Sequence, residues 1–221
     1  MVEPLISESL RRRLEGRPLC VHASMRSFAP RLSADVVLDA LLAIDCTIMV
    51  PTFTYELQQS APDAERPPRN GTDYSRKRSE HEHRYDARQN ELSRREMGAL
   101  PAALLERDRI RGEHPLNSFA AVGRLAGELI ERQTYQDVYQ PFASLIEHDG
   151  YVVLMGVGCT SMTLIHYAEE RAGRSLFQRW AKDRNGQRVV CATGSCSTAF
   201  GRFDRMLQEE RVTVSGSLWR V

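Results

Sequence analysis

The chain has 221 residues, which suits one large domain and is too short for two full enzyme domains. Hydrophobic residues make up 42% of it and charged residues 27%, a composition that excludes a chain disordered throughout. Thirty Lys and Arg against 29 Asp and Glu leave a net charge of +1. That balance argues against a general nucleic-acid or acidic-membrane binder, because both need a basic surface.

The sequence also argues against membrane insertion and secretion. No apolar run approaches the roughly 20 residues that a membrane-spanning helix needs, and the stretch 1–13 lacks the apolar core of a secretory signal. The five cysteines form no CxxC pair, which speaks against both a disulfide framework and a zinc site. We therefore expect a soluble, cytoplasmic protein that holds no metal.

The first elements along the chain predict a parallel α/β unit. A short apolar run at 18–22 favours a buried strand, and Ser33 is a suitable N-cap for a helix over 34–42. A second β-rich run follows at 47–51 and ends at a proline. Strand, helix and strand within about 35 residues are typical of a parallel crossover.

The stretch 57–96 has a different composition. It contains a proline-rich polar segment at 61–71, followed by mixed charges with hardly an aliphatic residue before Leu92. A loop of this length is usually functional or disordered. We expect one domain over 1–221, with 57–96 as an insertion or lid on one rim of the sheet.

Alternating strands and helices return after the insertion. The run Tyr151–Gly156 is continuous, apolar and β-branched, and is the strand most clearly indicated by the sequence. Helices are expected near 97–107, 125–132 and 163–171, and a strand at 118–122. The last fifty residues predict a β-rich tail with one helix near 199–208.

The arrangement that most resembles a catalytic site follows the strand at 151–156. Open α/β sheets bind their ligands at the carboxyl ends of their strands. His166 and Glu169 are three residues apart, so on a helix they share a face, and Thr163 lies one turn earlier on that face. A neutral imidazole held by a carboxylate is a competent general base. From spacing alone, a capping Thr with a surface His–Glu pair remains open.

Other candidates carry weaker signals. His114 precedes a proline that forces it out of the helical region, which fits a turn as well as a site. The segment Ser24–Ser27 follows His22 with two hydroxyls and a cation, a pattern suited to an anion. His81 and His83 fit a solvated loop better than a metal site. Cys196 has no evident base to activate it, although a thiol enzyme using Cys196 or Cys159 stays open.

Five blocks, taken in order, resemble the aminoglycoside 3-N-acetyltransferase family, also called the antibiotic N-acetyltransferases. The first two, VHASMRS at 21–27 and TIMVPTFT at 47–54, are similar to the family's VHSSLRS and GTLVMPTFT. The third combines MGAL at 97–100 with HPLNSFAAVG at 114–123. The fourth joins LMGVG at 154–158 to TLIHYAE at 163–169, and the fifth is GSCSTAF at 194–200.

The resemblance implies a three-layer α/β/α fold with a mixed central sheet. It implies transfer of an acetyl or short acyl group from acetyl-CoA to a primary amine of a small molecule, with no metal. His166 would be the catalytic base, Glu169 the acid that orients it, and Thr163 would stabilise the helix start or the oxyanion. A second copy of the chain is a candidate partner.

The resemblance also suggests binding residues. It assigns CoA to the strand end Ser24, Met25, Arg26, Ser27 and Phe28 and to the turn His114, Pro115, Leu116, Ser118 and Phe119. The acceptor would meet Thr52, Phe53, Tyr55 and Glu56. Two alternatives remain: a catalytically reduced relative that binds or scaffolds, and an enzyme specific for aminoglycosides that confers antibiotic resistance.

Overall fold

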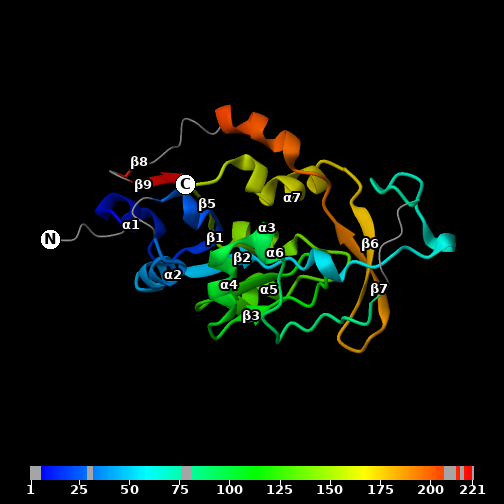
Figure 1. Ribbon diagram of the computed structural model, residues 1–221. Coiled ribbons are helices and arrows are strands. Elements are labelled where there is room, and N and C mark those ends of the chain that lie inside the picture. The colour runs from blue at the N-terminus through cyan, green and yellow to red at the C-terminus, as the bar shows by residue number, and fades with distance from the viewer. Residues whose placement is uncertain (1–5, 29–31, 76–80, 207–212, 215–216, 221) are drawn as a thin grey trace.

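The computed structural model describes residues 6–28, 32–75, 81–206, 213–214 and 217–220. A mixed sheet of seven strands runs through the molecule in the order β3-β4-β2-β1-β5-β9-β8 (Figure 1). Its strands, in chain order, are β1 (Pro18–Ala23), β2 (Thr47–Pro51), β3 (Ile110–Arg111), β4 (Phe119–Val122), β5 (Tyr151–Met155), β8 (Thr213–Val214) and β9 (Ser217–Arg220). No helix in the part of the chain that the structure describes is long and apolar enough to cross a membrane.

The predicted parallel crossover is confirmed. β1 pairs in parallel with β2 and, on its other side, with β5, and helix α2 (Ala34–Leu42) joins the first two strands. β4 runs antiparallel to β2. The carboxyl ends of β1, β2 and β5 therefore meet at one edge of the sheet, together with the start of β4.

Two apolar layers cover the sheet, because successive strand residues point to opposite faces. On β1, Leu19 and Val21 join one core, whereas Cys20 joins the other. On β2, Ile48 and Met49 separate in the same way. The first core packs under α1 (Glu8–Leu14), α2 and α4 (Ala99–Leu105), and the second under α5 (Ala126–Ile130) and α6 (Gln140–Glu147). The three-layer α/β/α architecture expected from the resemblance is what the structure shows.

A two-stranded antiparallel sheet, β6 (Phe177–Lys182) and β7 (Arg188–Thr193), stands beside this body (Figure 1). The excursion that the sequence predicts at 57–96 packs against it. The Gln59 backbone N–H donates to the Trp180 carbonyl over 2.7 Å, and the Gln178 N–H donates to Asn70 Oδ1 over 2.6 Å. The described part of the excursion is thus held to the backbone of β6 by hydrogen bonds.

Arg111 on β3 ties the end of the excursion to the main sheet. Its guanidinium is buried, donates to the carbonyls of Gln89, Glu91 and Thr52 over 2.8–2.9 Å, and lies over the Tyr85 ring. Burial lowers the pKa of Arg111. Hydrogen bonds to carbonyl oxygens offset the cost of burying this cation, and they fix the chain just before α3 (Arg94–Met97).

Some predicted helices differ from the observed ones. The helix expected over 97–107 is split into α3 and α4 at Gly98, whose φ of +81° is a conformation that favours glycine. The tail helix is a 3-10 helix, Thr198–Arg205, and Gln208 lies outside the described residues. The helix of the proposed site, α7 (Leu164–Arg171), begins one residue after the expected start.

Candidate active site

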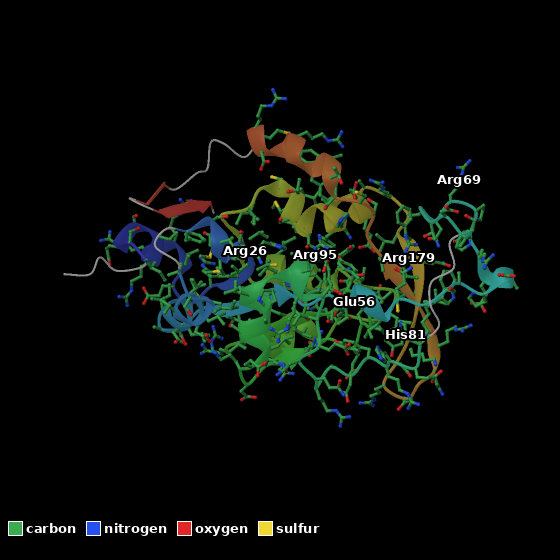
Figure 2. The ribbon with its side chains drawn as sticks, in the orientation of Figure 1. Arg26, Glu56, Arg69, His81, Arg95 and Arg179 are labelled. Carbon is green, nitrogen blue, oxygen red and sulfur yellow. The ribbon has the colours of Figure 1, made fainter. Side chains whose placement is uncertain are left out.

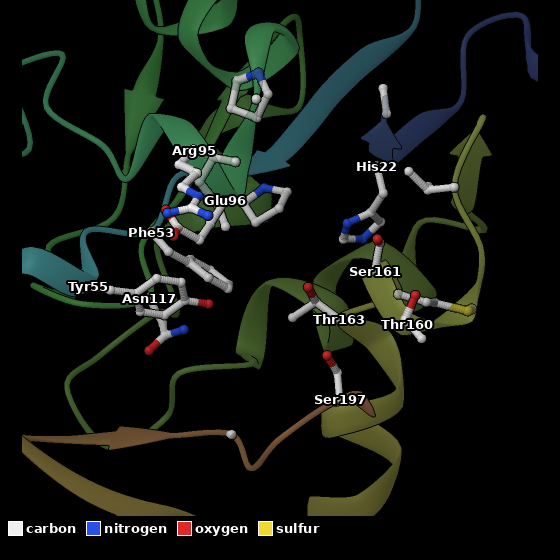
Figure 3. A pocket seen from close by; sticks show the side chains of 18 of the residues that line it. His22, Phe53, Tyr55, Arg95, Glu96, Asn117, Thr160, Ser161, Thr163 and Ser197 are labelled. Atoms are coloured by element: carbon white, nitrogen blue, oxygen red, sulfur yellow. The ribbon is translucent and has the colours of Figure 1, made fainter. Parts of the chain in front are cut away.

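A cleft of about 740 Å³ opens at the carboxyl ends of the parallel strands, a size that suits an organic ligand. Figure 3 shows its two walls facing one another. Phe53, Tyr55, Arg95, Glu96 and Asn117 form one wall, and the other includes His22, Thr160, Ser161, Thr163 and Ser197. The cleft thus lies at the sheet edge that the strand order predicts.

His166 reaches this cleft from the first turns of α7. The residue is 8% exposed, and its Nδ1 lies 3.1 Å from Oε2 of Glu169, one turn along the helix. An ionised carboxylate can only accept, so Nδ1 carries the proton and Nε2 is left with its lone pair. Arg174 binds the other oxygen of the same carboxylate. Within the described part of the chain, Nε2 has no hydrogen-bond partner.

Aromatic packing fixes the plane of the His166 ring. The Tyr139 ring lies nearly parallel to it, with centroids 5.9 Å apart and 16° between planes, and Phe200 packs at 4.7 Å. Gly194 comes so close that an added Cβ would lie 2.3 Å from the Tyr139 oxygen and 2.8 Å from His166 Cγ. Any other residue at 194 would push the ring aside. The imidazole is therefore held in place before any ligand arrives.

The charge state of His166 suits proton acceptance. Burial lowers its pKa below the ordinary value of 6.5, and Glu169 opposes that shift by favouring the charged ring. The neutral form therefore dominates at neutral pH, while the carboxylate stands ready to stabilise the imidazolium once a proton arrives. The buried position of the ring gives the first property, and Glu169 one helical turn away gives the second.

Thr163 and the end of β1 are brought to the same cleft. Thr163 precedes α7, lines the cavity and makes no capping hydrogen bond through its side chain. Ser24, Met25 and Arg26 also line it. Ser27 and Phe28 do not: the Ser27 hydroxyl donates to the Gly156 carbonyl over 3.0 Å, and Phe28 is buried in the first core. Of the expected CoA segment, the structure places the first three residues at the cleft.

The second expected CoA segment is mostly buried. His114 is fully buried: its Nδ1 accepts from the N–H groups of Leu116 and Asn117, and its Nε2 donates to the Ala192 carbonyl over 2.9 Å. Burial lowers its pKa to about 4. Leu116 lines the cleft, whereas His114, Pro115, Ser118 and Phe119 do not. His114 fastens this turn to β7 and thereby shapes the wall.

The four residues expected at the acceptor have different surroundings. Phe53 and Tyr55 line the cleft. Thr52 is buried and bonded to Ser118 and Arg111, so it supports the wall from behind. Glu56 does not line the cleft; it is exposed and accepts from the Ser93 hydroxyl. The structure thus separates two lining residues from two that stabilise the wall.

Several lining residues carry no local sequence signal. Tyr139 and Gly194 converge on His166 from distant segments, and Arg95, Asn117 and Arg179 come from three more. Neither His81 nor Cys196 lines the cleft, and within the described residues no three metal-ligating side chains gather in one place. Nothing in the sequence indicated that Gly194 approaches the ring of His166, because the two residues lie in different segments.

Comparisons with known proteins show which family the chain belongs to. The family model described as aminoglycoside 3-N-acetyltransferase matches residues 20–220. The aminoglycoside N(3)-acetyltransferase IX of Micromonospora chalcea is 36% identical over 115 residues, which are 48% of this chain and 41% of that relative. The matched segment is therefore less than half the length of that curated relative.

Two solved structures show the same fold. The YokD protein from Bacillus subtilis superposes with a TM-score of 0.71 at 21% identity, covering 95% of this chain and 89% of its own. An AAC-IIIb complex with CoASH gives a TM-score of 0.68 at 19% identity, covering 95% and 89%. With the family model spanning nearly the whole chain, the protein belongs to the aminoglycoside 3-N-acetyltransferase family.

Proposed function

We propose that this protein transfers an acetyl group from acetyl-CoA to a primary amine of a small molecule, with His166 as the general base. The observation that carries the proposal is the His166–Glu169 pair, whose bare Nε2 belongs to a ring lining a ligand-sized cleft. Family membership supports the reaction class, and a structural neighbour with bound CoASH supports the co-substrate.

His166 and the two substrates account for every bond and proton in this reaction. The amine nitrogen forms a bond to the thioester carbonyl carbon while its proton passes to Nε2 of His166, and Glu169 stabilises the resulting imidazolium. The carbon–sulfur bond then breaks, and the proton on His166 returns to the departing CoA sulfur. Base catalysis of this kind is worth about 10²–10⁴-fold. The hydroxyl of Thr163, beside the same ring, would donate to the developing oxyanion.

The end of β1 suits CoA. Arg26 lines the cleft there and has no ion-pair partner among the described residues, so its guanidinium is available for a phosphate. Met25 and Leu116 add apolar surface for the pantetheine arm. The acceptor would then approach past Tyr55 from the wall formed by the excursion. Aminoglycosides, after which the relatives are named, are the first amines to test.

The test is a thiol-release assay with acetyl-CoA and a panel of amines, in which the product is identified by mass spectrometry. We expect CoA release that depends on the amine, and a product heavier by one acetyl group. Binding of acetyl-CoA without turnover on any amine would contradict the proposal and favour a binding protein.

A further inference from the structure

A second histidine, His22, lines the cleft that holds His166. It is 6% exposed and follows Cys20 by two residues on β1, so both side chains point to the same face of the sheet. Cys20 belongs to the second core on that face, and His22 lies where this row of side chains leaves the core and enters the cleft. Figure 3 shows the ring of His22 projecting from β1 on the side of Ser161 and Thr163. The cleft therefore contains two imidazoles, and the proposed reaction uses only His166.

One nitrogen of the His22 ring has a partner and the other has none. Nε2 lies 3.6 Å from the sulfur of Cys20, a hydrogen-bond contact. Burial lowers the pKa of His22 to about 4 and raises the pKa of the Cys20 thiol, so both groups are neutral at neutral pH. Nδ1 has no hydrogen-bond partner among the residues that the structure describes. Buried polar atoms normally have a partner, and a ligand in the cleft can supply one here.

The Cys20 thiol favours one tautomer of His22. The thiol keeps its proton, and sulfur is a weak acceptor of hydrogen bonds, whereas the free lone pair of an imidazole nitrogen is a good one. The contact is therefore best satisfied when the thiol donates to Nε2. Nδ1 then carries the proton of the neutral ring, and its N–H is a donor without an acceptor in the described part of the chain.

Acetyl-CoA, bound as the proposed function has it, brings acceptors to this N–H. Figure 2 shows Arg26 on the opposite side of Arg95 from Glu56, so phosphates held by Arg26 would lie on the β1 side of the cleft. A pantetheine arm that joins phosphates at Arg26 to a thioester at His166 has to cross the cleft that His22 lines. The arm is uncharged and carries amide carbonyls along its length and a thioester carbonyl at its end. A neutral N–H donor matches these oxygens.

We propose that His22 binds the pantetheine arm of acetyl-CoA: its Nδ1–H donates a hydrogen bond to a carbonyl oxygen of the arm and thereby holds the thioester beside His166. The inference rests on the proposed function and adds a residue that orients its co-substrate. The two imidazoles then have different roles. His166, paired with a carboxylate, takes the proton of the amine, whereas His22, paired with a neutral thiol, keeps its proton throughout.

The first test follows the nitrogen signals of histidine-labelled wild-type protein during titration with adenosine bisphosphate, CoA and acetyl-CoA. We expect Nδ1 of His22 to be the protonated nitrogen and its signal to shift when acetyl-CoA binds, because the N–H gains an acceptor. A shift with CoA as well assigns the amide carbonyls, and a shift with acetyl-CoA alone assigns the thioester carbonyl. Adenosine bisphosphate lacks the arm and should leave the signal unchanged. His148, which does not line the cleft, is the control within the same spectra.

Calorimetric titration of acetyl-CoA into the same sample separates the outcomes. Acetyl-CoA that binds and leaves the Nδ1 signal of His22 unchanged would overturn the inference and leave the proposed function intact. An equal shift with adenosine bisphosphate and with CoA would assign the ring to the phosphate end of CoA and would also overturn it. Absence of acetyl-CoA binding would contradict the proposed function, and the inference with it.

The second test uses a matched pair of variants. The side-chain amide of Asn reaches about as far as Nδ1 of histidine, and that of Gln about as far as Nε2. His22→Asn should therefore retain the affinity for acetyl-CoA, whereas His22→Gln should weaken it by about 3- to 10-fold, the usual effect of a neutral hydrogen bond. His148→Gln is the control for replacing a histidine outside the cleft and should bind as the wild type does.

Kinetics of the same variants distinguish the two carbonyl sources. In His22→Gln, only the KM for acetyl-CoA should rise if an amide carbonyl is bound, and kcat should also fall if the thioester carbonyl is bound. Equal affinities of His22→Asn and His22→Gln for acetyl-CoA would overturn the inference. If either variant fails to fold, the titration of the wild-type protein still decides, because it needs no substitution.

Discussion

Two histidines of this protein share burial but differ in their partners. His166 is 8% exposed and His114 is fully buried. The Nδ1 of His166 donates to a carboxylate, which leaves Nε2 bare, whereas both nitrogens of His114 are engaged by the backbone. The partner of a buried imidazole decides its role: a carboxylate prepares the ring to take a proton, whereas backbone groups fix it as a structural contact.

Replacing His166 should have the largest effect on turnover. His166→Ala should lower turnover by about 10²–10⁴-fold, because it removes the base, while acetyl-CoA binding persists. The measurement is thiol release per folded molecule, paired with calorimetric titration of acetyl-CoA. Turnover close to wild type would show that another group takes the proton.

His114→Ala should lower the stability of the protein and leave its turnover nearly unchanged. It would leave the N–H groups of Leu116 and Asn117 and the Ala192 carbonyl without their partner. We expect a loss of about 2–4 kcal/mol in the free energy of unfolding, from urea titration, because these buried groups become unsatisfied and a cavity opens. Turnover of the folded fraction should change little. If activity vanished while stability held, His114 would belong to the chemistry.

Glu169→Gln should act on His166 in a way that its pH dependence reveals. Glu169 raises the pKa of His166, so its loss lowers that pKa further and moves the acid limb of kcat to lower pH. We also expect kcat to fall about 10-fold, because the imidazolium loses its stabilising charge. Arg174→Gln is the matched control with the opposite sign, since Arg174 lowers the same pKa. A limb that moved upward in Glu169→Gln would contradict the pairing.

The smallest expected effect is on how the free energy of unfolding depends on pH in mild acid. The pKa of His114 is about 4 in the folded protein and about 6.5 in the unfolded chain, so only the unfolded chain binds the proton between these values. Stability should therefore be fully present above pH 6.5 and fall as the pH drops toward 4, by about 1.4 kcal/mol per pH unit from this residue. His114→Gln should reduce the slope of unfolding free energy against pH by about one proton. An unchanged slope would show that His114 is not buried as a neutral ring.

The sequence predicted what local patterns can encode. The crossover of β1, α2 and β2, the strand β5 and the helical spacing of His166 and Glu169 all follow from residues close in the chain. Together they place a candidate base at one edge of the sheet, and the structure has it there. Periodicity was enough for these features, because each depends on one turn or one strand.

Contacts between residues far apart in the chain could not be predicted from the sequence. His114 and Ala192 are 78 residues apart, and nothing near either one indicates their hydrogen bond. Thr52 follows β2 as a ligand-binding residue would, but the buried guanidinium of Arg111 takes up its hydroxyl and its carbonyl. The lining of the cleft is equally non-local, since Arg95 on α3 and Arg179 on β6 both line it.

The most direct test of the account is the tautomer of His166, read from nitrogen chemical shifts of histidine-labelled protein at neutral pH. We predict a proton on Nδ1 and a bare Nε2 for His166, and the reverse for His114. A proton on Nε2 of His166 would leave that nitrogen unable to accept one from an amine, and would contradict its role as the base.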